Sequence, residues 1–270
     1  MIEIETFFTK SSASGDWVFL DSIEIPNRAM NFGDGLFETM VWDVKEIRFF
    51  NYHIKRLLGG MQLLNLDVTS LNPEELVQFL GSKFPNERKR VRWNVFRKGA
   101  GKYTPEGTDV SQLLQVSDFR PAPAVKQKVD VSSKIQLFPN TWSAYKTLNS
   151  LPYVLANQER KERGLDEIIL LDGRGNISES GASNIFWIKD GIVFTPSLSC
   201  NCINGVSRQV ILDYMDLKKV PYRVGEFLLT ELEGAEQILV SNCTGISYLG
   251  RWRLRKYSTE PIEFISGIFE

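Results

Sequence analysis

Two residues of this chain could act together on a flat organic ring, one as an amine and one as a carboxylate. Lys146 lies among apolar and aromatic neighbours with no adjacent acid. A lysine removed from water has a lowered pKa, and its neutral amine can then attack a carbonyl and form a Schiff base. Glu179 lies among small residues just before an apolar run, where its carboxylate could keep a pyridine nitrogen protonated. Taken singly, a solvated surface lysine and a turn acid are the commoner interpretations.

The other residue types that usually carry catalysis are scarce. His53 is the only histidine, and its place at the start of a helix is typical of a cap or a surface residue. Nucleophilic triads and most metal sites need more histidine than this. Cys200 and Cys202 are too close in sequence for the usual structural zinc pair, and Cys243 stands alone, so we expect ordinary thiols and no metal. Proton transfer must therefore fall to lysine, carboxylate or tyrosine side chains.

Three features could hold a phosphate group. A helix opens after a glycine at Val206 and Ser207, where free amides and a hydroxyl suit an anion. A turn after a strand contains Thr244, which offers a second hydroxyl. Arg56 lies on a helix and could pair with a phosphate dianion as a bidentate donor. An ordinary capped helix, an ordinary turn and an exposed arginine are the alternatives.

The elements that position these residues mix strands and helices without strict alternation, which indicates an α+β protein. Alternating or apolar runs predict strands at 2–9, 17–20, 90–96, 129–137, 167–171, 184–188, 192–195 and 237–241. Helical spacing of apolar residues predicts helices at 51–66, 151–163 and 204–215. A further helix opens at Asn72 and Pro73, which are a favoured cap and first residue.

The clearest boundary along the chain is a proline-rich segment. Pro121 and Pro123 favour an extended connector. We therefore expect two domains, at 1–119 and 124–270, joined by a linker at 120–123.

Composition argues against several classes of partner. The chain has 33 acidic and 32 basic residues and a net charge of -1, which gives no reason to expect nucleic acid or a charged membrane surface. No stretch approaches about 18 apolar residues, so no membrane span is expected. The first residues lack the basic start and apolar run of a signal peptide. With three cysteines and no disulfide pattern, we expect a cytoplasmic protein that binds a small molecule.

The order and content of these segments resemble one family. The chain looks like a class-IV aminotransferase, the pyridoxal-phosphate (PLP) fold-type IV group of branched-chain and D-amino-acid transaminases and aminodeoxychorismate lyase. The resemblance covers about residues 20 to 250, and its most specific parts are the glycine-acid-glycine segment and the Glu179 segment. The matching segments lie at 28–39, 53–60, 97–105, 146–149, 167–196, 205–208 and 241–245.

This resemblance implies a fold, a cofactor and roles for individual residues. The implied fold is α+β, with a small α/β domain followed by a larger barrel-like α+β domain, usually as a homodimer in which both subunits line the active site. Lys146 would form the Schiff base with PLP and shuttle protons, and Glu179 would pair with the pyridine nitrogen. Phosphate would be held by Arg56, the amides of Val206 and Ser207, and Thr244, while Asn149 lies near where relatives support the ring hydroxyl.

The chain departs from its relatives on the substrate side. Met30 stands where many amino-acid transaminases have an aromatic residue. The segment after Gly101 has no arginine to grip a substrate carboxylate. Lys102, Arg97 or a loop arginine such as Arg251 would have to serve instead, or the carboxylate is held differently.

Two reactions and one inactive alternative follow from this family. We favour an aminotransferase that moves an amino group between an amino acid and a 2-oxo acid through the Lys146 Schiff base. The alternative is a lyase that converts aminodeoxychorismate to 4-aminobenzoate and pyruvate for folate synthesis. A binding protein that kept the fold and lost the chemistry is the third interpretation, and the presence of Lys146 and Glu179 disfavours it.

Overall fold

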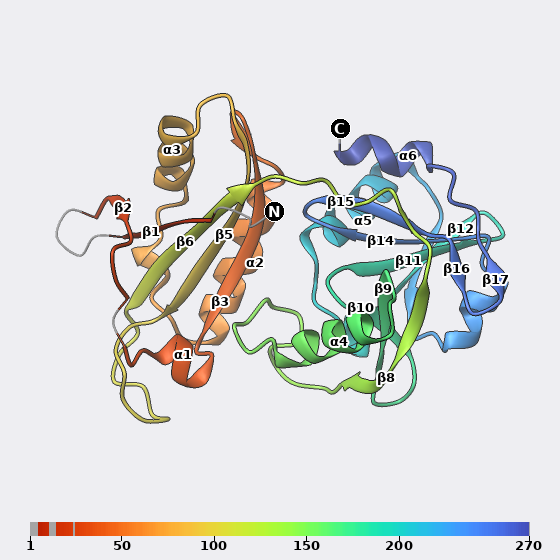
Figure 1. The fold of residues 1–270 in the computed structure, drawn as a ribbon, viewed down its shortest axis with the longest axis horizontal. Coiled ribbons are helices and arrows are strands. Elements are labelled where there is room, and N and C mark those ends of the chain that lie inside the picture. Colours follow the sequence, from red (N-terminus) through yellow and green to blue (C-terminus); the bar gives the residue numbers. More distant parts are fainter. Residues whose placement is uncertain (1–4, 11–14, 24, 270) are drawn as a thin grey trace. The chain divides into compact units, whose positions relative to one another are not determined.

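The computed structural model describes residues 5–10, 15–23 and 25–269, and it divides the chain into two units that we treat separately. The first unit comprises the chain up to Arg120 together with Tyr145–Asn149. The second comprises Pro121–Ala144 and the residues from Ser150 onward. Figure 1 shows the helices and strands of both, with labels on most of them. Among the described residues, no helix is both long and apolar enough to cross a membrane.

The first unit is built on one antiparallel sheet with strand order β2-β1-β6-β5-β3-β4. Its strands are β1 (Thr6–Lys10), β2 (Trp17–Phe19), β3 (Gly35–Asp43), β4 (Glu46–Ile47), β5 (Arg88–Arg97) and β6 (Val110–Asp118). Its helices are α1 (Arg28–Phe32), α2 (Phe50–Leu63), α3 (Pro73–Lys83) and the 3-10 turn η1 (Val68–Ser70).

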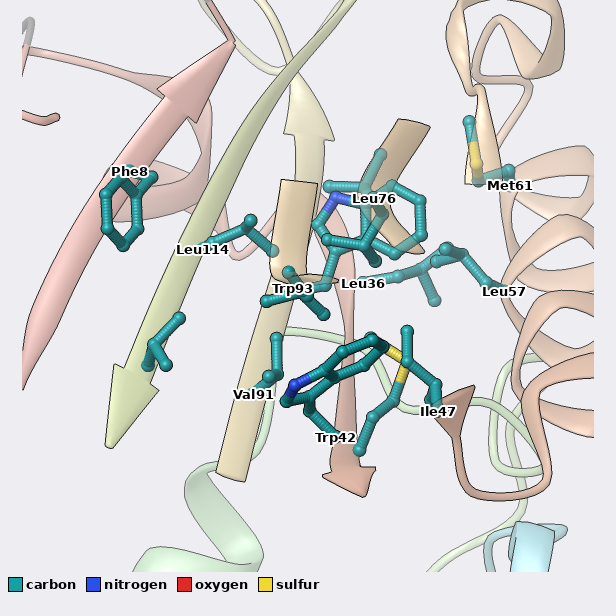
Figure 2. Close-up of a cluster of buried hydrophobic side chains, with 14 of the residues drawn as sticks. Phe8, Leu36, Trp42, Ile47, Leu57, Met61, Leu76, Val91, Trp93 and Leu114 are labelled. Atoms are coloured by element: carbon teal, nitrogen blue, oxygen red, sulfur yellow. The ribbon is translucent and has the colours of Figure 1, made fainter. Parts of the chain in front are cut away.

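One face of this sheet packs on α2 and α3. Leu36, Met40 and Trp42 alternate along β3 and are buried, as the two-residue period of a strand requires. Figure 2 shows Leu36 and Trp42 among side chains such as Leu57 of α2 and Leu76 of α3, and Met40 belongs to the same cluster. Burying one such side chain stabilises the fold by about 1.5–3 kcal/mol. The core therefore fixes which face β3 presents to the helices, and with it the direction of the intervening residues.

The segment Tyr145–Asn149 lies in the first unit, whereas the sequence placed Lys146 in the second. The Phe37 amide donates to the Lys146 carbonyl at 2.8 Å, and the Leu148 amide donates to the Gly35 carbonyl at 2.9 Å. The segment thus extends the first sheet at the start of β3, and backbone pairing overrides its position in the sequence.

The second unit contains two sheets. One has six strands in the order β13-β12-β11-β14-β15-β7, and the other has five strands in the order β10-β9-β8-β16-β17. Its strands are β7 (Val125–Lys126), β8 (Val129–Leu137), β9 (Glu167–Asp172), β10 (Ile177–Ser180), β11 (Asn184–Lys189), β12 (Ile192–Pro196), β13 (Tyr222–Gly225), β14 (Gln237–Asn242), β15 (Gly245–Leu249), β16 (Arg251–Trp252) and β17 (Arg255–Lys256). Its helices are α4 (Leu151–Glu162), α5 (Val206–Lys218), α6 (Glu263–Ser266), η2 (Leu198–Cys200), η3 (Leu229–Gly234) and η4 (Gly267–Phe269).

Both sheets of this unit contribute to one apolar core. Ile169 and Ile177 enter it from the five-stranded sheet, and Ile185 and Trp187 from the six-stranded sheet. The outer faces are covered by helices, since α4 packs on β8 and β9, while α5 packs on β14. Two sheets around a shared core form the barrel-like α+β arrangement that the resemblance implied.

The predicted elements agree with the observed ones best where the hydrophobic period is long. The helix expected at 51–66 is α2, and the strand expected at 90–96 lies inside β5. Part of the strand expected at 2–9 lies outside the described residues, and β1 covers Thr6–Lys10. The sequence analysis did not predict the two nine-residue strands β3 and β6, in which apolar and polar residues do not alternate regularly. It also missed the short strands β4, β7, β10, β13, β15, β16 and β17, because brief runs carry little periodicity.

Candidate active site

In the first unit, Lys146 lies against the ring of Phe37. Its Nζ is 4.3 Å from the ring centroid, and the Arg92 guanidinium carbon is 3.6 Å from the same centroid. The β3–β5 register explains this grouping, because Phe37 pairs with Asn94 and Thr39 with Arg92, which puts their side chains on one face of the sheet. A cation over an aromatic face is stabilised by the ring quadrupole. The buried Phe37 ring therefore contacts both the Lys146 amine and the Arg92 guanidinium.

Arg92 is a candidate site residue that the sequence analysis missed. Its side chain is partly buried, and its Nε donates to Asn94 Oδ1 at 3.0 Å. Burial, and after it the charge of Arg90, lowers the pKa of Arg92 to about 10, so the guanidinium stays protonated at neutral pH. No acidic side chain in the described ranges forms an ion pair with Arg92. The sequence did contain a signal for Arg92. Because residues 90–96 alternate as a strand does, Arg92 is expected on the face of the sheet opposite the core.

Glu38, the next residue of β3, points the other way and meets α2. Its Oε1 accepts from Arg56 Nε at 2.7 Å, and its Oε2 accepts from Arg56 Nη2 at 2.6 Å. His53 Nδ1 lies 2.6 Å from the same Oε2. His53 and Arg56 are three residues apart on α2, which puts both on the helix face that packs on β3. All three side chains are buried.

The charges of this cluster follow from its contacts. Burial raises the pKa of Glu38, but the Arg56 charge and the hydrogen bonds from His53 and Arg56 outweigh it and lower the pKa to about 2. Burial lowers the pKa of His53, against the opposing pull of Glu38. Glu38 is thus ionised and His53 neutral at pH 7, with Nδ1 carrying the proton. The expectation of His53 as a cap or surface residue is wrong, because Phe49 caps α2 and the imidazole is inside.

The contacts of Arg97 give it a structural role in place of the substrate role considered from sequence. Its Nε donates to Asp34 Oδ2 at 2.9 Å, and Arg28 Nε donates to the same oxygen at 2.7 Å. The other guanidinium donors of Arg97 bind the backbone carbonyls of Leu64, Asn65 and Gly107. Those of Arg28 bind the carbonyls of Ala100, Lys102 and Tyr103. The two arginines hold loops together around one partly buried carboxylate, that of Asp34.

The other first-unit residues proposed from sequence lie near the surface or near β3. Met30 is 68% exposed on α1, and Lys102 is exposed in the loop that Arg28 holds. Asn149 ends the segment that pairs with β3, and its backbone lies beside Gly33. Gly33 has a φ of 63° in the left-handed region, so the close approach and the turn both favour glycine.

In the second unit, Glu179 lies on β10 and is buried. Its Oε1 accepts from the Tyr153 hydroxyl at 2.6 Å and from the Ile203 amide at 3.1 Å, and its Oε2 accepts from Asn184 Nδ2 at 3.4 Å. Burial, together with the Glu179 charge, raises the pKa of Tyr153 well above its usual range, so the phenol keeps its proton and donates it. The register of β10 shifts between Ile177 and Glu179, a bulge that redirects the Glu179 side chain.

The predicted phosphate-binding amides lie at the first turn of α5. Gly205 precedes Val206 and Ser207, and the first amides of a helix have no partner within the helix. A Cβ at Gly205 would overlap Asn184 Oδ1, so only glycine allows the helix start to approach β11 this closely. Ser207 Oγ lies 3.1 Å from Ser241 Oγ, which ties the start of α5 to β14.

Thr244 lies in the turn between β14 and β15. Its amide and its hydroxyl both donate to Asn242 Oδ1, at 2.9 and 2.7 Å. Asn242 in turn donates to Ser183 Oγ at 3.0 Å. The turn is therefore held by a side chain of its own strand, in the manner of an Asx turn.

Asn184 connects the second-unit residues into one group. It contacts Glu179, donates to the Ile203 carbonyl at 2.8 Å and pairs with Ser241 in the β11–β14 ladder. Ser241 in turn contacts Ser207. The structure thus gathers Glu179, the start of α5 and the end of β14 in one unit. Sequence reasoning missed both Asn184 and Tyr153, since their partners are distant along the chain.

The two units together contain the donor types that PLP requires. The first offers the Lys146 amine and the Arg56 guanidinium, and the second offers the buried Glu179 carboxylate and the first-turn amides of α5. Among the described residues, no cluster of His, Cys, Asp and Glu could hold a metal ion. Cys202 is buried, and burial raises the pKa of its thiol to about 12, which makes it a poor nucleophile.

Comparison with known proteins decides the family. Residues 35–247 match the family described as "Amino-transferase class IV". The chain belongs to this family. Members depend on PLP, so the chain is a PLP-dependent enzyme, and the prediction of family, cofactor and fold-type IV architecture is confirmed.

Similar proteins include both transaminases and a lyase. A D-alanine aminotransferase from Listeria monocytogenes is 27% identical over 232 residues, which cover 83% of this chain and 79% of that protein. An aminodeoxychorismate lyase from Vibrio harveyi is 23% identical, over 82% of this chain and 83% of that protein. The structure of a branched-chain aminotransferase from Thermoproteus uzoniensis with norvaline has a TM-score of 0.85 at 20% identity, covering 98% and 93% of the two chains. This last likeness concerns the fold alone.

Proposed function

We propose that Lys146 is the amine that holds PLP in this aminotransferase and that it moves the proton between substrate and cofactor. The observation that carries this proposal is the fixed position of Lys146. Its backbone pairs with β3 through Phe37, and its Nζ lies against the buried Phe37 ring. PLP, when bound, supplies an electron sink that stabilises the carbanion formed at the substrate. A lysine with a pre-set backbone and side-chain direction suits repeated proton transfer at one carbon.

The remaining cofactor contacts are proposed from the same family pattern. Glu179 pairs with the pyridine nitrogen, which its burial and its hydrogen bonds from Tyr153, Ile203 and Asn184 support by fixing the direction of the carboxylate. Arg56, the amides of Val206 and Ser207, and Thr244 hold the phosphate, and Asn149 supports the ring hydroxyl. For Thr244 this requires its hydroxyl to turn from Asn242 toward the phosphate.

We propose Arg92 as the group that binds a substrate carboxylate. Arg97 uses its donors on Asp34 and on backbone carbonyls, and Lys102 is exposed. Arg92 is partly buried and shares the Phe37 ring with Lys146. A guanidinium in that environment binds carboxylates through paired charge-assisted hydrogen bonds. Amino acids and 2-oxo acids both carry such a carboxylate.

The experiment that tests the role of Lys146 is borohydride trapping. Reconstituted protein is expected to show a visible absorbance band that borohydride removes, and peptide mapping should find the reduced adduct on Lys146. Lys146→Ala should abolish the band and lower activity by orders of magnitude, while Lys55→Ala, at an exposed position on α2, should leave both unchanged. An adduct on another lysine would contradict the proposal.

A second candidate reaction is aminodeoxychorismate lysis in folate synthesis, which the Vibrio harveyi relative favours. An aminotransferase incubated with a panel of amino acids alone changes its absorbance spectrum and releases 2-oxo acids. A lyase instead releases 4-aminobenzoate and pyruvate from aminodeoxychorismate. The absence of any spectral change across a wide panel of both chiralities would favour the lyase.

We also propose that the protein is a cytoplasmic homodimer. Several apolar side chains of the first unit are exposed, which is typical of a surface that a second copy covers: Val18, Phe19, Ile25, Met30 and Tyr103. The low cysteine count supports a reducing compartment. Sedimentation velocity should give the mass of two chains, and a monomer at micromolar concentration would contradict the dimer. Cell fractionation tests the location.

A further inference from the structure

Glu38 is the centre of a buried cluster whose geometry fixes the direction of an arginine. Both oxygens of its carboxylate are used, Oε1 by Arg56 Nε and Oε2 by Arg56 Nη2 and His53. Glu38 is 1% exposed and Arg56 8% exposed. A guanidinium held along one edge by a carboxylate is confined to a single plane and a single direction. The cluster therefore sets the orientation of Arg56 before any ligand arrives.

The charges of the cluster indicate that it orients Arg56 and adds no positive charge to the guanidinium. Ionised Glu38 cancels the Arg56 charge, and burial keeps His53 neutral, so the three side chains together carry no net charge. His53 adds a donor to Glu38 without adding a second positive charge. Its Nε2 has no hydrogen-bond partner among the described residues, and its Nδ1 lies 2.6 Å from Glu38 Oε2.

One strand links this cluster to Lys146. Phe37 and Glu38 are neighbours on β3, and their side chains point to opposite faces of the sheet. The Phe37 amide and ring hold Lys146, while the Glu38 carboxylate holds Arg56. A slip of β3 by one residue would exchange the two faces, so the register that positions the amine also positions the guanidinium.

We propose that Glu38 is the positioning residue for the arginine that binds the cofactor phosphate, with His53 completing the set of donors that holds Glu38 in place. This inference rests on the proposed function, in which Arg56 binds the phosphate. It assigns Glu38 no contact with substrate or cofactor. Its consequence is specific to the phosphate group: loss of Glu38 should impair binding of PLP and spare binding of pyridoxal, which has the same ring and aldehyde but no phosphate.

Glu159 offers a matched control, because it is a second buried carboxylate with an arginine partner. It accepts from Arg163 Nη1 at 2.8 Å and from the hydroxyls of Ser132 and Ser133, and it holds the backbone of β8. The interactions around it also lower its pKa to about 2, although burial alone would raise it. Glu159→Gln thus reproduces the loss of a buried ionised acid at a place without a proposed phosphate ligand.

The test measures the dissociation constants of PLP and of pyridoxal, by absorbance or fluorescence titration, for wild type, Glu38→Gln and Glu159→Gln. Glu38→Gln is expected to weaken PLP binding about ten- to a hundredfold, the range of a charge-assisted hydrogen bond, with pyridoxal binding changed less than about threefold. Glu159→Gln should leave the ratio of the two constants at the wild-type value.

The positioning role of Glu38 can also be refuted by the same measurements. If Glu38→Gln weakens PLP and pyridoxal binding by the same factor, or neither, the positioning role is wrong. Should Glu38→Gln fail to fold, Glu38→Asp keeps the charge and withdraws the carboxylate by one methylene, and an unchanged PLP-to-pyridoxal ratio in that variant also refutes the inference. Failure of the proposed function looks different, because wild type itself would then bind PLP no better than pyridoxal or form no adduct on Lys146.

Discussion

At the residue scale, neighbouring side chains of one strand serve separate purposes. Phe37 faces Lys146 and Arg92, and Glu38 faces Arg56 and His53. In the second unit Glu179 is fixed by Tyr153, a residue whose hydroxyl stays protonated because burial and the adjacent carboxylate raise its pKa. These side chains are thus each held by a partner from a different part of the chain. Individual substitutions should therefore separate substrate binding from cofactor binding.

Arg92→Gln tests the substrate side. Removing the guanidinium deletes charge-assisted hydrogen bonds to the substrate carboxylate worth about 1.5–3 kcal/mol, so kcat/KM should fall about ten- to a hundredfold, mainly through KM. The dissociation constant of PLP should stay near the wild-type value. Steady-state kinetics with an amino-acid donor measures this effect.

Arg90→Gln is the matched control for that variant. Arg90 lies two residues earlier on β5, opposite Val41, and so farther along the strand from the ring that contacts Lys146. Its replacement should change kcat/KM less than about threefold, as most surface substitutions have small effects. Equal losses in the two variants would mean that general charge, and no specific contact, binds the carboxylate.

At the element scale, the start of α5 depends on a close approach to β11. Gly205 has an ordinary φ of -60°, which any residue can adopt. Glycine is therefore required here because of the space available to a side chain, and the backbone conformation does not require it. A Cβ there overlaps Asn184 Oδ1, and Asn184 in turn contacts Glu179. One glycine therefore controls both the placement of the helix amides and the hydrogen bonding of the proposed ring-nitrogen partner.

Gly205→Ala should accordingly affect stability and cofactor affinity together. Overpacking of this kind costs about 1–3 kcal/mol, which should lower Tm, and displacement of Asn184 should weaken PLP binding. Differential scanning fluorimetry with and without PLP measures both. Gly267→Ala is the control, because a Cβ at Gly267 meets no atom within 4 Å. A Gly205→Ala protein with wild-type Tm and PLP affinity would show that the contact with Asn184 is dispensable.

At the scale of the whole molecule, buried acids in both units make stability depend on pH. The pKa values of Glu38 and Glu159 are about 2 in the folded protein, below the usual value of 4.5. The unfolded chain therefore takes up protons first as the pH falls. The stabilisation is complete above about pH 5 and is lost progressively as the pH falls toward 2.

Urea unfolding followed from pH 7 to pH 3 should show this loss. Glu38 alone contributes on the order of 3 kcal/mol at neutral pH, so the free energy of unfolding should fall steeply below about pH 5. Glu38→Gln should be less stable than wild type at pH 7 and should show a smaller decline on acidification. A wild-type protein equally stable at pH 7 and pH 3 would contradict the ionised, hydrogen-bonded state of these acids.

The sequence by itself determined the family and the cofactor, through the order and content of its segments. Lys146, Glu179 and the glycine-led start of α5 are each weak signals when taken alone, and they were predicted as site residues because their order along the chain matches the family. Helix α2 and strand β5 could be predicted because their apolar periods are long enough to distinguish a helix from a strand.

Only the tertiary structure decided which side chains meet. Arg97 binds Asp34, His53 binds Glu38, and Arg92 shares a ring with Lys146, all through pairings set by the sheet register. Lys146 belongs to the first unit because its backbone pairs with β3, far away in sequence. A one-residue change of register would reverse these assignments without altering any local propensity. The family and its cofactor could therefore be inferred from the sequence, whereas the contacts of the proposed site residues depended on long-range strand pairing.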